Sequence, residues 1–265
     1  MSRPRLFLPE ERWASRVELQ PDERRHLVDV LRLAPGGEVE VFNGAGAFSR
    51  AILVRDRGGY VLELGPSTQR LIPNQPVRLG VALLKGRKLD EVVRMVTELG
   101  VSTVEPFTCA RSIPRPDDAG RARRTRWQKI AAEASRQSGR ASVPRIQPVR
   151  SFDELVRGST QDPKRGARAV LYEAALGQTL LTWLASEANV ERLLLVGPEG
   201  GFAPDEVERA EQAGFAILSL GPTILRSDTA AIVAAAIACL DSQQRVGYRF
   251  QSKGCDDDLP PLRVS

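Results

Sequence analysis

The chain has few of the residues on which the commonest catalytic and structural centres depend. It contains one histidine, His26, so neither a Ser-His-Asp hydrolase nor a histidine-rich metal site is available, and we expect no metal. Its three cysteines, Cys109, Cys239 and Cys255, are scattered, which argues against a disulfide framework or a paired-cysteine metal site and indicates a reducing cytoplasm. The GxxxxGK[ST] sequence of P-loop nucleotide-binding sites is also missing.

Long apolar runs are missing as well. No stretch approaches the roughly 20 apolar residues that a transmembrane helix needs, so we expect no membrane partner. The first residues, MSRPRLFLPEE, have no apolar segment before their charges, and a secretory signal is not expected. With 265 residues, 42% of them hydrophobic and 27% charged, the composition is that of a globular protein with one large or two ordinary domains.

The net charge of +5 is concentrated in one segment. Between Arg111 and Arg145, ten basic residues stand against three acidic ones, so this segment carries +7 and the remainder is slightly negative. Two interpretations fit: a solvated arginine-rich face, or a surface for the phosphates of a nucleic acid, since clustered arginines add Coulomb attraction and bidentate donors. The charge pattern favours a nucleic-acid partner.

The first part of the chain predicts a small β-rich domain over residues 1–70. A helix begins at Pro21, and strands separated by glycine-rich turns are predicted over Glu38–Phe42, Ala51–Val54 and Tyr60–Leu64. Short strands with closely spaced turns are typical of a small barrel. The glycines of Gly44–Ser49 resemble a dinucleotide fingerprint, but the third glycine and the following helix are missing, so we interpret them as a hairpin turn.

A proline-rich linker over Pro66–Pro76 leads to a second predicted domain at 75–245, in which strands and helices alternate. The predicted strands are Val77–Leu84, Val101–Phe107, Ala169–Tyr172, Leu193–Val196 and Phe215–Leu220. The predicted helices are Leu89–Leu99, Arg121–Ser138, Thr179–Ala188, Pro204–Ala213 and Asp228–Leu240. This alternation indicates an α/β domain with a parallel sheet. The last helix is apolar nearly all round, which places it in a core or a subunit interface, and 246–265 is expected to be a flexible tail.

Two loops of this domain stand where a ligand is expected. Gly197–Gly201 and Ser219–Thr229 each follow a strand and precede a helix, and ligands of open α/β sheets bind outside the carboxyl ends of strands. The three glycines of the first loop let a ligand approach the backbone, although a tight turn without a ligand would look similar. The second loop sets Arg226 beside a helix start that Ser227 or Asp228 can cap.

These loops and other stretches resemble the RsmE family of SPOUT methyltransferases, which methylate N3 of uridine in small-subunit ribosomal RNA. The matching stretches are Arg25–Arg32, Lys85–Gly86, Thr97–Val101, Arg111–Ser112, Arg126–Ala131, Gln137–Arg140, Gly197–Phe202 and Leu220–Ala230. They follow one another in the family's order from about residue 5 to 240. The chain departs from the family pattern at Arg94-Met95, Ala110, Arg136 and Asp228.

The resemblance implies a PUA-like barrel followed by a SPOUT domain with a C-terminal trefoil knot, a homodimer, and S-adenosylmethionine (SAM) bound in the loops of the knot. The implied cofactor-binding residues are Leu171, Tyr172, Glu173, Gly197, Gly200, Gly201, Ser219, Leu220, Gly221, Leu225 and Thr229. Uridine N3 carries a proton that must leave. Arg226 is the candidate cation for the uridinate, and Glu199 is either the base or a residue that bonds to the backbone.

The implied partner is ribosomal RNA or the small ribosomal subunit. The candidate RNA-binding residues are Arg5, His26, Arg32, Lys85, Arg111, Gln137 and Arg140. Two alternatives remain open: a SPOUT enzyme with another acceptor, such as a ribose 2′-hydroxyl, another base or tRNA, and a non-catalytic RNA-binding or ribosome-assembly factor. The missing glycine fingerprint disfavours a Rossmann-type methyltransferase.

Overall fold

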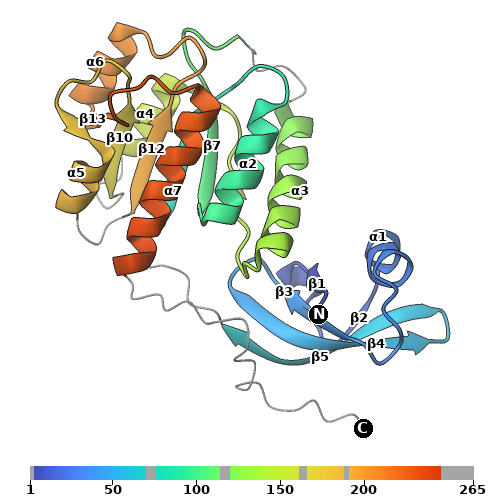
Figure 1. Cartoon of the computed structure of the whole chain (residues 1–265). Coiled ribbons are helices and arrows are strands. Elements are labelled where there is room, and N and C mark those ends of the chain that lie inside the picture. The colour runs from blue at the N-terminus through green and yellow to red at the C-terminus, as the bar shows by residue number, and fades with distance from the viewer. Residues whose placement is uncertain (1–2, 70–75, 114–119, 161–165, 188–190, 246–265) are drawn as a thin grey trace. The chain divides into compact units, whose positions relative to one another are not determined.

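The computed structural model describes residues 3–69, 76–113, 120–160, 166–187 and 191–245. The chain divides into two compact units (Figure 1). Unit 1 is built on Met1–Ile72 together with Gly139–Ser142, and unit 2 on Pro73–Ser138 and Val143–Val246. The predicted tail at 246–265, with Cys255, lies outside the described residues.

Unit 1 is a five-stranded sheet in the order β1-β3-β4-β5-β2. Its strands are β1 (Arg5–Phe7), β2 (Arg16–Glu18), β3 (Glu38–Phe42), β4 (Ala47–Asp56) and β5 (Gly59–Gln69). A short 3₁₀ turn, η1 (Glu10–Arg12), separates β1 from β2. β1 runs parallel to β3, and the remaining pairs are antiparallel. Along β4 buried and half-buried residues alternate, so one face of the sheet packs on a core that includes Leu27 and Leu53.

The turn between β3 and β4 is the predicted hairpin turn. The Asn43 side-chain oxygen accepts the N–H groups of Ala45 and Ala47 at 2.8 and 3.0 Å, and Gly44 and Gly46 have φ angles of +80° and +102°. The Gly46 N–H in turn donates to the Ala141 carbonyl at 3.1 Å, so residues 139–142 are part of unit 1. The glycines here serve the turn, as their missing fingerprint indicated.

Of two expectations for unit 1, the helix is confirmed at its start and the linker needs correction. The helix begins at Pro21 as predicted, but α1 (Pro21–Arg24) passes directly into a π-helical segment, η2 (Arg25–Val30), and Arg32 follows with a φ of +54°. The predicted linker over Pro66–Pro76 is wrong at its start, because β5 continues to Gln69. Pro66 is tolerated because the β4–β5 register shifts between Ser49 and Ala51, opposite Pro66, where the hydrogen-bond ladder is interrupted.

Unit 2 contains an eight-stranded sheet whose described pairings are all parallel, which confirms the predicted α/β class. The strand order is β11-β13-β10-β12-β6-β7-β8, and β9 also pairs with β7. The strands are β6 (Val77–Ala82), β7 (Thr103–Thr108), β8 (Arg145–Ile146), β9 (Arg150–Ser151), β10 (Ala167–Leu171), β11 (Gln178–Thr179), β12 (Arg192–Val196) and β13 (Ala216–Ser219).

Helices cover both faces of this sheet (Figure 1). They are α2 (Lys88–Leu99), α3 (Gly120–Ser138), α4 (Phe152–Thr160), α5 (Leu180–Ser186), α6 (Pro204–Gln212) and α7 (Ser227–Arg245). α2, α3, α5 and α7 share one hydrophobic cluster with the sheet, while α4 and α6 share the other. Burial on both faces explains why β12 is apolar at successive positions, Leu193 to Val196.

The predicted apolar helix is α7, and it packs one face into the core. Ala231, Ala234, Ala235 and Ala238 are fully buried in the cluster with α2 and β6, whereas Leu240 is half exposed. At the C-terminal end of α7, Asp241 Oδ2 lies 2.9 Å from Nη2 of Arg192, which is completely buried at the start of β12. Arg245 binds the same Asp241 carboxylate at 2.8 Å. α7 is therefore fastened to the sheet at the edge where β12 begins. No helix among the described residues is long and apolar enough to cross a bilayer.

Candidate functional site

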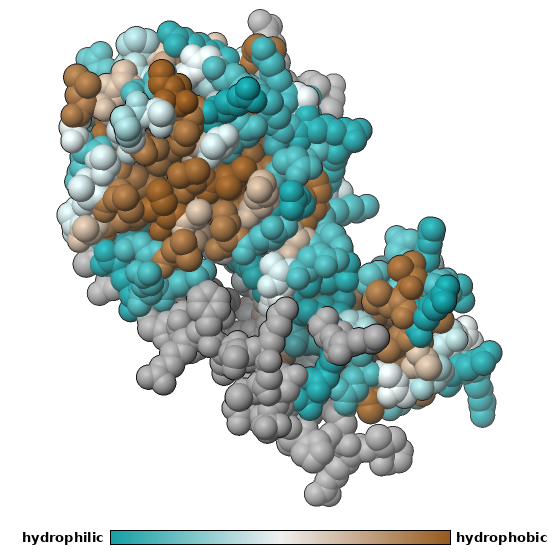
Figure 2. Space-filling model, in the orientation of Figure 1, coloured by the Kyte–Doolittle hydropathy of each residue, from teal (hydrophilic) through white to brown (hydrophobic). Residues whose placement is uncertain are grey.

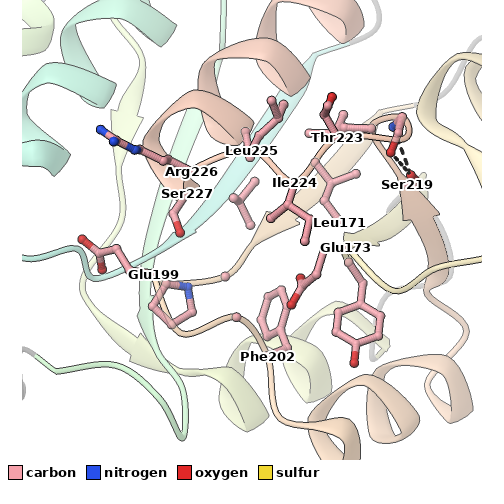
Figure 3. Close-up of a pocket in the computed structure, with 18 of the residues that line it drawn as sticks. Leu171, Glu173, Glu199, Phe202, Ser219, Thr223, Ile224, Leu225, Arg226 and Ser227 are labelled. Carbon is pink, nitrogen blue, oxygen red and sulfur yellow. Dashed lines mark hydrogen bonds between the residues drawn. The ribbon is translucent and has the colours of Figure 1, made fainter.

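A pocket of about 360 Å³ lies at the carboxyl ends of β10, β12 and β13 (Figure 3). These strands are adjacent in the sheet, with β10 in the middle, so the loops that follow them converge at one place. The described lining residues are Lys88, Leu171, Tyr172, Glu173, Val196, Gly197, Pro198, Glu199, Gly201, Phe202, Ser219, Leu220, Gly221, Thr223, Ile224, Leu225, Arg226, Ser227 and Ala230.

The pocket brings together most of the residues singled out from the sequence. Nine of the eleven candidate cofactor residues line it, as do Glu199 and Arg226. Gly200 and Thr229 are not among the described lining residues. Gly200 belongs to the same loop, but its carbonyl accepts a hydrogen bond from Arg111 Nη1 at 2.9 Å, and Thr229 is exposed on α7.

The loop over Gly197–Gly201 needs glycine for reasons that the geometry makes specific. Gly201 has a φ of +67°, and a Cβ placed there would lie 2.8 Å from Oε1 of Glu173, whose carboxylate reaches the same part of the pocket. A Cβ at Gly197 would lie 3.1 Å from the Phe202 ring, which is buried against Phe107 and Phe152. The loop thus presents bare backbone while an aromatic cluster holds it from behind.

The second loop is shaped by its own hydrogen bonds. The Ser219 hydroxyl accepts the Gly221 N–H at 3.0 Å and donates to the Gly221 carbonyl at 3.0 Å, and Gly221 has a φ of +130°. Beyond this turn the chain places Thr223, Ile224 and Leu225 along the pocket (Figure 3). Ile224 is 81% exposed, so this wall of the pocket is apolar and open to a ligand.

Apart from Glu173, the charged side chains of the described lining residues gather at one end of the pocket. Figure 3 shows Arg226 and Glu199 on the side away from Ser219. Glu199 Oε1 accepts hydrogen bonds from Lys88 Nζ at 3.0 Å and from the Lys85 N–H at 3.3 Å. Partial burial raises the pKa of Glu199, but the Lys88 ammonium and the backbone donors outweigh it and hold the pKa below its ordinary value. Arg226 is exposed, and its guanidinium has no hydrogen-bond or ion-pair partner within the described ranges.

Sequence reasoning missed several lining residues. Thr223, Ile224 and Ser227 belong to the predicted ligand loop Ser219–Thr229, so their place in that loop could have identified them as lining residues. Lys88 is the first residue of α2, which follows β6, and only the adjacency of β6 and β12 in the sheet brings it to the pocket. Phe202 is the last residue of a matching stretch, and its packing shows that it supports the glycine loop.

The candidate RNA-binding residues of unit 1 differ in how much of the side chain is available. Arg5 is committed within the fold: its Nε donates to Glu40 at 2.7 Å, its Nη2 donates to the Arg140 carbonyl at 2.9 Å, and it stacks on Phe42. Arg140 donates to Ser142 at 3.1 Å. His26 is half-buried on η2, and Arg32 is exposed.

The three candidates of unit 2 lie on different elements. Lys85 is exposed beside the pocket, and Arg111 is exposed and bonded to the glycine loop. Gln137 lies on α3 and donates to Glu133 at 3.1 Å. The basic segment therefore does not present all its cations freely, because Arg124 also donates to the Ile146 carbonyl at 2.8 Å and Arg136 pairs with Glu133.

With this geometry in place, comparison with known proteins defines the class. The family model of an RNA methyltransferase domain matches residues 72–239, which include the whole pocket. A protein of Mycobacterium bovis is 31% identical over 80% of this chain and 82% of its own length, and one of Bacillus subtilis is 32% identical over 80% and 85%. Both are named ribosomal RNA small subunit methyltransferase E. The chain belongs to this family of RNA methyltransferases.

Solved structures agree with this assignment over both units. The ribosomal RNA small subunit methyltransferase E of Neisseria gonorrhoeae, bound to SAM, superposes with a TM-score of 0.78 at 28% identity, covering 92% of this chain and 98% of that one. A methyltransferase of Legionella pneumophila, also in complex with SAM, gives a TM-score of 0.79 at 26% identity and the same coverage.

Proposed function

We propose that this protein transfers a methyl group from SAM to N3 of uridine in small-subunit ribosomal RNA. The observation that supports this most is the pocket itself. Its volume is that of a small-molecule cofactor site, its apolar wall and bare loop backbone suit an adenosine, and the Glu173 carboxylate offers an acceptor for ribose hydroxyls or an ammonium group. The residues present fit SAM, which supplies an electrophilic methyl group when bound.

Three loops would hold the cofactor. They are the segment Leu171–Glu173, the loop Gly197–Gly201 and the loop Ser219–Leu225, and they would bind it largely through backbone groups. The knot implied by the resemblance belongs to this proposal, because the same loops would form it. We also propose that unit 1 is a PUA-like domain. The protein would act in the cytoplasm, where its substrate is found.

The charged end of the pocket is where the uridine would enter. The base must be unpaired or extruded so that its Watson–Crick edge reaches the pocket. Fixing N3 at attack distance supplies much of the acceleration. Arg226 lies at this end without a partner among the described residues, and it would stabilise the uridinate that forms when the N3 proton leaves. Lys88 stands nearby, but Glu199 already neutralises it.

Glu199 had two candidate roles, base or loop-bonding residue. Its contacts favour the second role, since the Lys85 N–H and the Lys88 ammonium both donate to Oε1 and the pKa of Glu199 is lowered rather than raised. A general base for neutral pH needs a pKa nearer to 7. The N3 proton would then pass to water, with Arg226 stabilising the anion.

The homodimer is also part of the proposal. Figure 2 shows an apolar area on the face of unit 2 where Figure 1 places α7. Leu181 and Leu240 are exposed by 65% and 53%, and large exposed apolar areas mark interaction surfaces. Light scattering of the wild type and of Leu181→Glu/Leu240→Glu tests this: a dimer that the double substitution turns into monomers supports it, and a monomeric wild type refutes it.

Methylation is tested with small ribosomal subunits or their RNA, labelled SAM, and mass spectrometry of nuclease digests to locate the methylated atom. A methyl group on uridine N3 supports the proposal. A methyl group on a ribose hydroxyl, on another base or in tRNA alone replaces the proposed acceptor. If calorimetry finds no SAM binding to the folded protein, the alternative of a non-catalytic RNA-binding factor leads.

A further inference from the structure

A second pocket, of about 280 Å³, opens in unit 2 between the β6–α2 loop and α3. Its described lining residues are Leu83, Leu84, Gly86, Arg87, Leu89, Asp90, Arg123, Arg126 and Trp127. Its floor is apolar and buried, since Leu83, Leu84, Leu89 and Trp127 are each at most 4% exposed. Neither the family's cofactor loops nor the candidate RNA-binding residues take part in it.

The polar groups of this pocket are mostly guanidinium groups. Arg87, Arg123 and Arg126 stand against a single carboxylate, Asp90. Asp90 is already committed, because it pairs with Arg126 and accepts the Trp127 indole N–H at 3.0 Å. Arg87 is exposed and makes no side-chain hydrogen bond or ion pair within the described ranges. Among the described lining residues guanidinium groups outnumber carboxylates, and Arg87 offers a guanidinium that is ready for an anion.

The position of the pocket links it to the reaction. The β6–α2 loop contributes Arg87 to the second pocket, and the next residue, Lys88 at the start of α2, lines the first. The loop and the start of α2 are joined to the glycine loop through the hydrogen bonds from Lys85 and Lys88 to Glu199. Both pockets thus border the junction between this loop and α2 at the carboxyl edge of the sheet, and the second lies on the side of the charged end of the first.

We propose that the second pocket binds a backbone phosphate of the RNA strand next to the methylated nucleotide, with Arg87 and Arg123 as its ligands. This rests on the proposed function, since it assigns a subsite to the same RNA. A phosphate one or two nucleotides from an extruded base is the anion that an RNA strand brings to this place. Two guanidinium groups over an apolar floor bind its oxygens with charge-assisted hydrogen bonds.

The test is binding of a fluorescein-labelled single-stranded oligouridine, measured by anisotropy at several KCl concentrations, for wild type and Arg87→Ala/Arg123→Ala. The double variant should bind about tenfold more weakly at low salt. The slope of log affinity against log salt should fall by about 0.7, the value for one phosphate contact on a single strand. Arg121→Ala/Lys129→Ala, which removes two exposed charges from α3 outside the pocket, should have a clearly smaller effect.

Calorimetry of SAM binding separates the outcomes. Loss of RNA affinity with unchanged SAM affinity supports the subsite, and so does recovery of the salt slope in Arg87→Lys/Arg123→Lys. Wild-type affinity and slope in the double alanine variant overturn it. If the wild type binds RNA through this pocket yet shows no SAM binding or methylation, the proposed function fails while the phosphate site stands. Should the double variant unfold, Arg87→Glu at the exposed loop position decides: a loss supports the site, and no loss refutes it.

Discussion

The two ends of the parallel strands carry arginines in different states. At the amino end of β12, Arg192 is completely buried and bound to Asp241. At the carboxyl end of the strands, Arg226 is exposed and has no partner within the described ranges. Arg78 and Glu105 repeat the first pattern, with Glu105 buried between Arg78 and Arg150. Burying a charge is tolerated only with close partners, so these groups hold the sheet and its helices together. An exposed guanidinium has no such structural duty and can act on a ligand.

The largest effect is expected at the buried edge. Asp241→Ala leaves the Arg192 guanidinium in the interior without its counter-charge, and burial already lowers the pKa of Arg192. We expect a loss of about 3 kcal/mol or more in the free energy of unfolding, measured by urea denaturation. Asp205→Ala, which breaks an exposed ion pair with Arg209, is the matched control and should leave the urea midpoint nearly unchanged. Equal midpoints for both variants would contradict the comparison.

The next effect is on catalysis at the open edge. Arg226→Ala should lower kcat of methyl transfer about 100-fold, the usual result of removing one group that stabilises developing negative charge. The unfolding free energy should stay close to that of the wild type, because the side chain makes no described contact in the fold. SAM affinity should stay within twofold to threefold of wild type. Arg226→Lys should recover part of kcat. A variant with normal kcat and raised KM would make Arg226 an RNA-binding residue instead.

A smaller effect is expected on cofactor binding. Gly201→Ala adds a Cβ that is strained by the positive φ and lies 2.8 Å from Glu173 Oε1, so SAM affinity measured by calorimetry should fall about tenfold. Gly177→Ala, where a Cβ meets nothing within 4 Å, is the control. In a Glu173→Ala background the substitution at Gly201 should lower SAM affinity by a smaller factor. An unchanged penalty there would show that backbone strain alone is responsible.

The smallest effect is expected at Glu199. Its pKa is lowered, so its ion pair with Lys88 is fully present above the ordinary carboxyl range and is lost only as pH falls through that lowered value. The residue is therefore ionised throughout pH 6–9. Glu199→Gln should reduce kcat by about threefold at most, and the pH–rate profile should keep its shape over that range. Loss of a rising limb in the variant would identify Glu199 as the base.

The parallel sheet and two loops of the pocket, Gly197–Gly201 and Ser219–Thr229, were predictable because they depend on local patterns, whereas Leu171–Glu173 was named only through the family resemblance. Apolar strands of five or so residues, glycines after a strand and Pro204 at a helix start are all readable along the chain. Helix α4 was readable too, since Ser151 and Glu154 form a capping pair in which the Glu154 carboxylate accepts the Ser151 N–H at 2.8 Å, but it was not predicted.

What could not be predicted depends on contacts between distant segments. Arg5 looked available for RNA, yet its partners Glu40 and the Arg140 carbonyl lie 35 and 135 residues away. Lys88 meets Glu199 across 111 residues, and the second pocket needs α2 and α3 side by side. Pro66 suggested a linker because a β-bulge, which makes proline acceptable in a strand, leaves no fixed sequence pattern.

The alanines of α7 have a consequence for the order of the site. An alanine side chain has no rotamers to lose, so burying Ala231, Ala234, Ala235 and Ala238 fixes this helix at a lower conformational-entropy cost than longer side chains would require. The same small side chains let the helix pack close to β6 and α2. The first turn of α7 therefore holds Ser227 and the adjacent Arg226 backbone in place. Only the side chain of Arg226 has to become ordered when it binds a ligand.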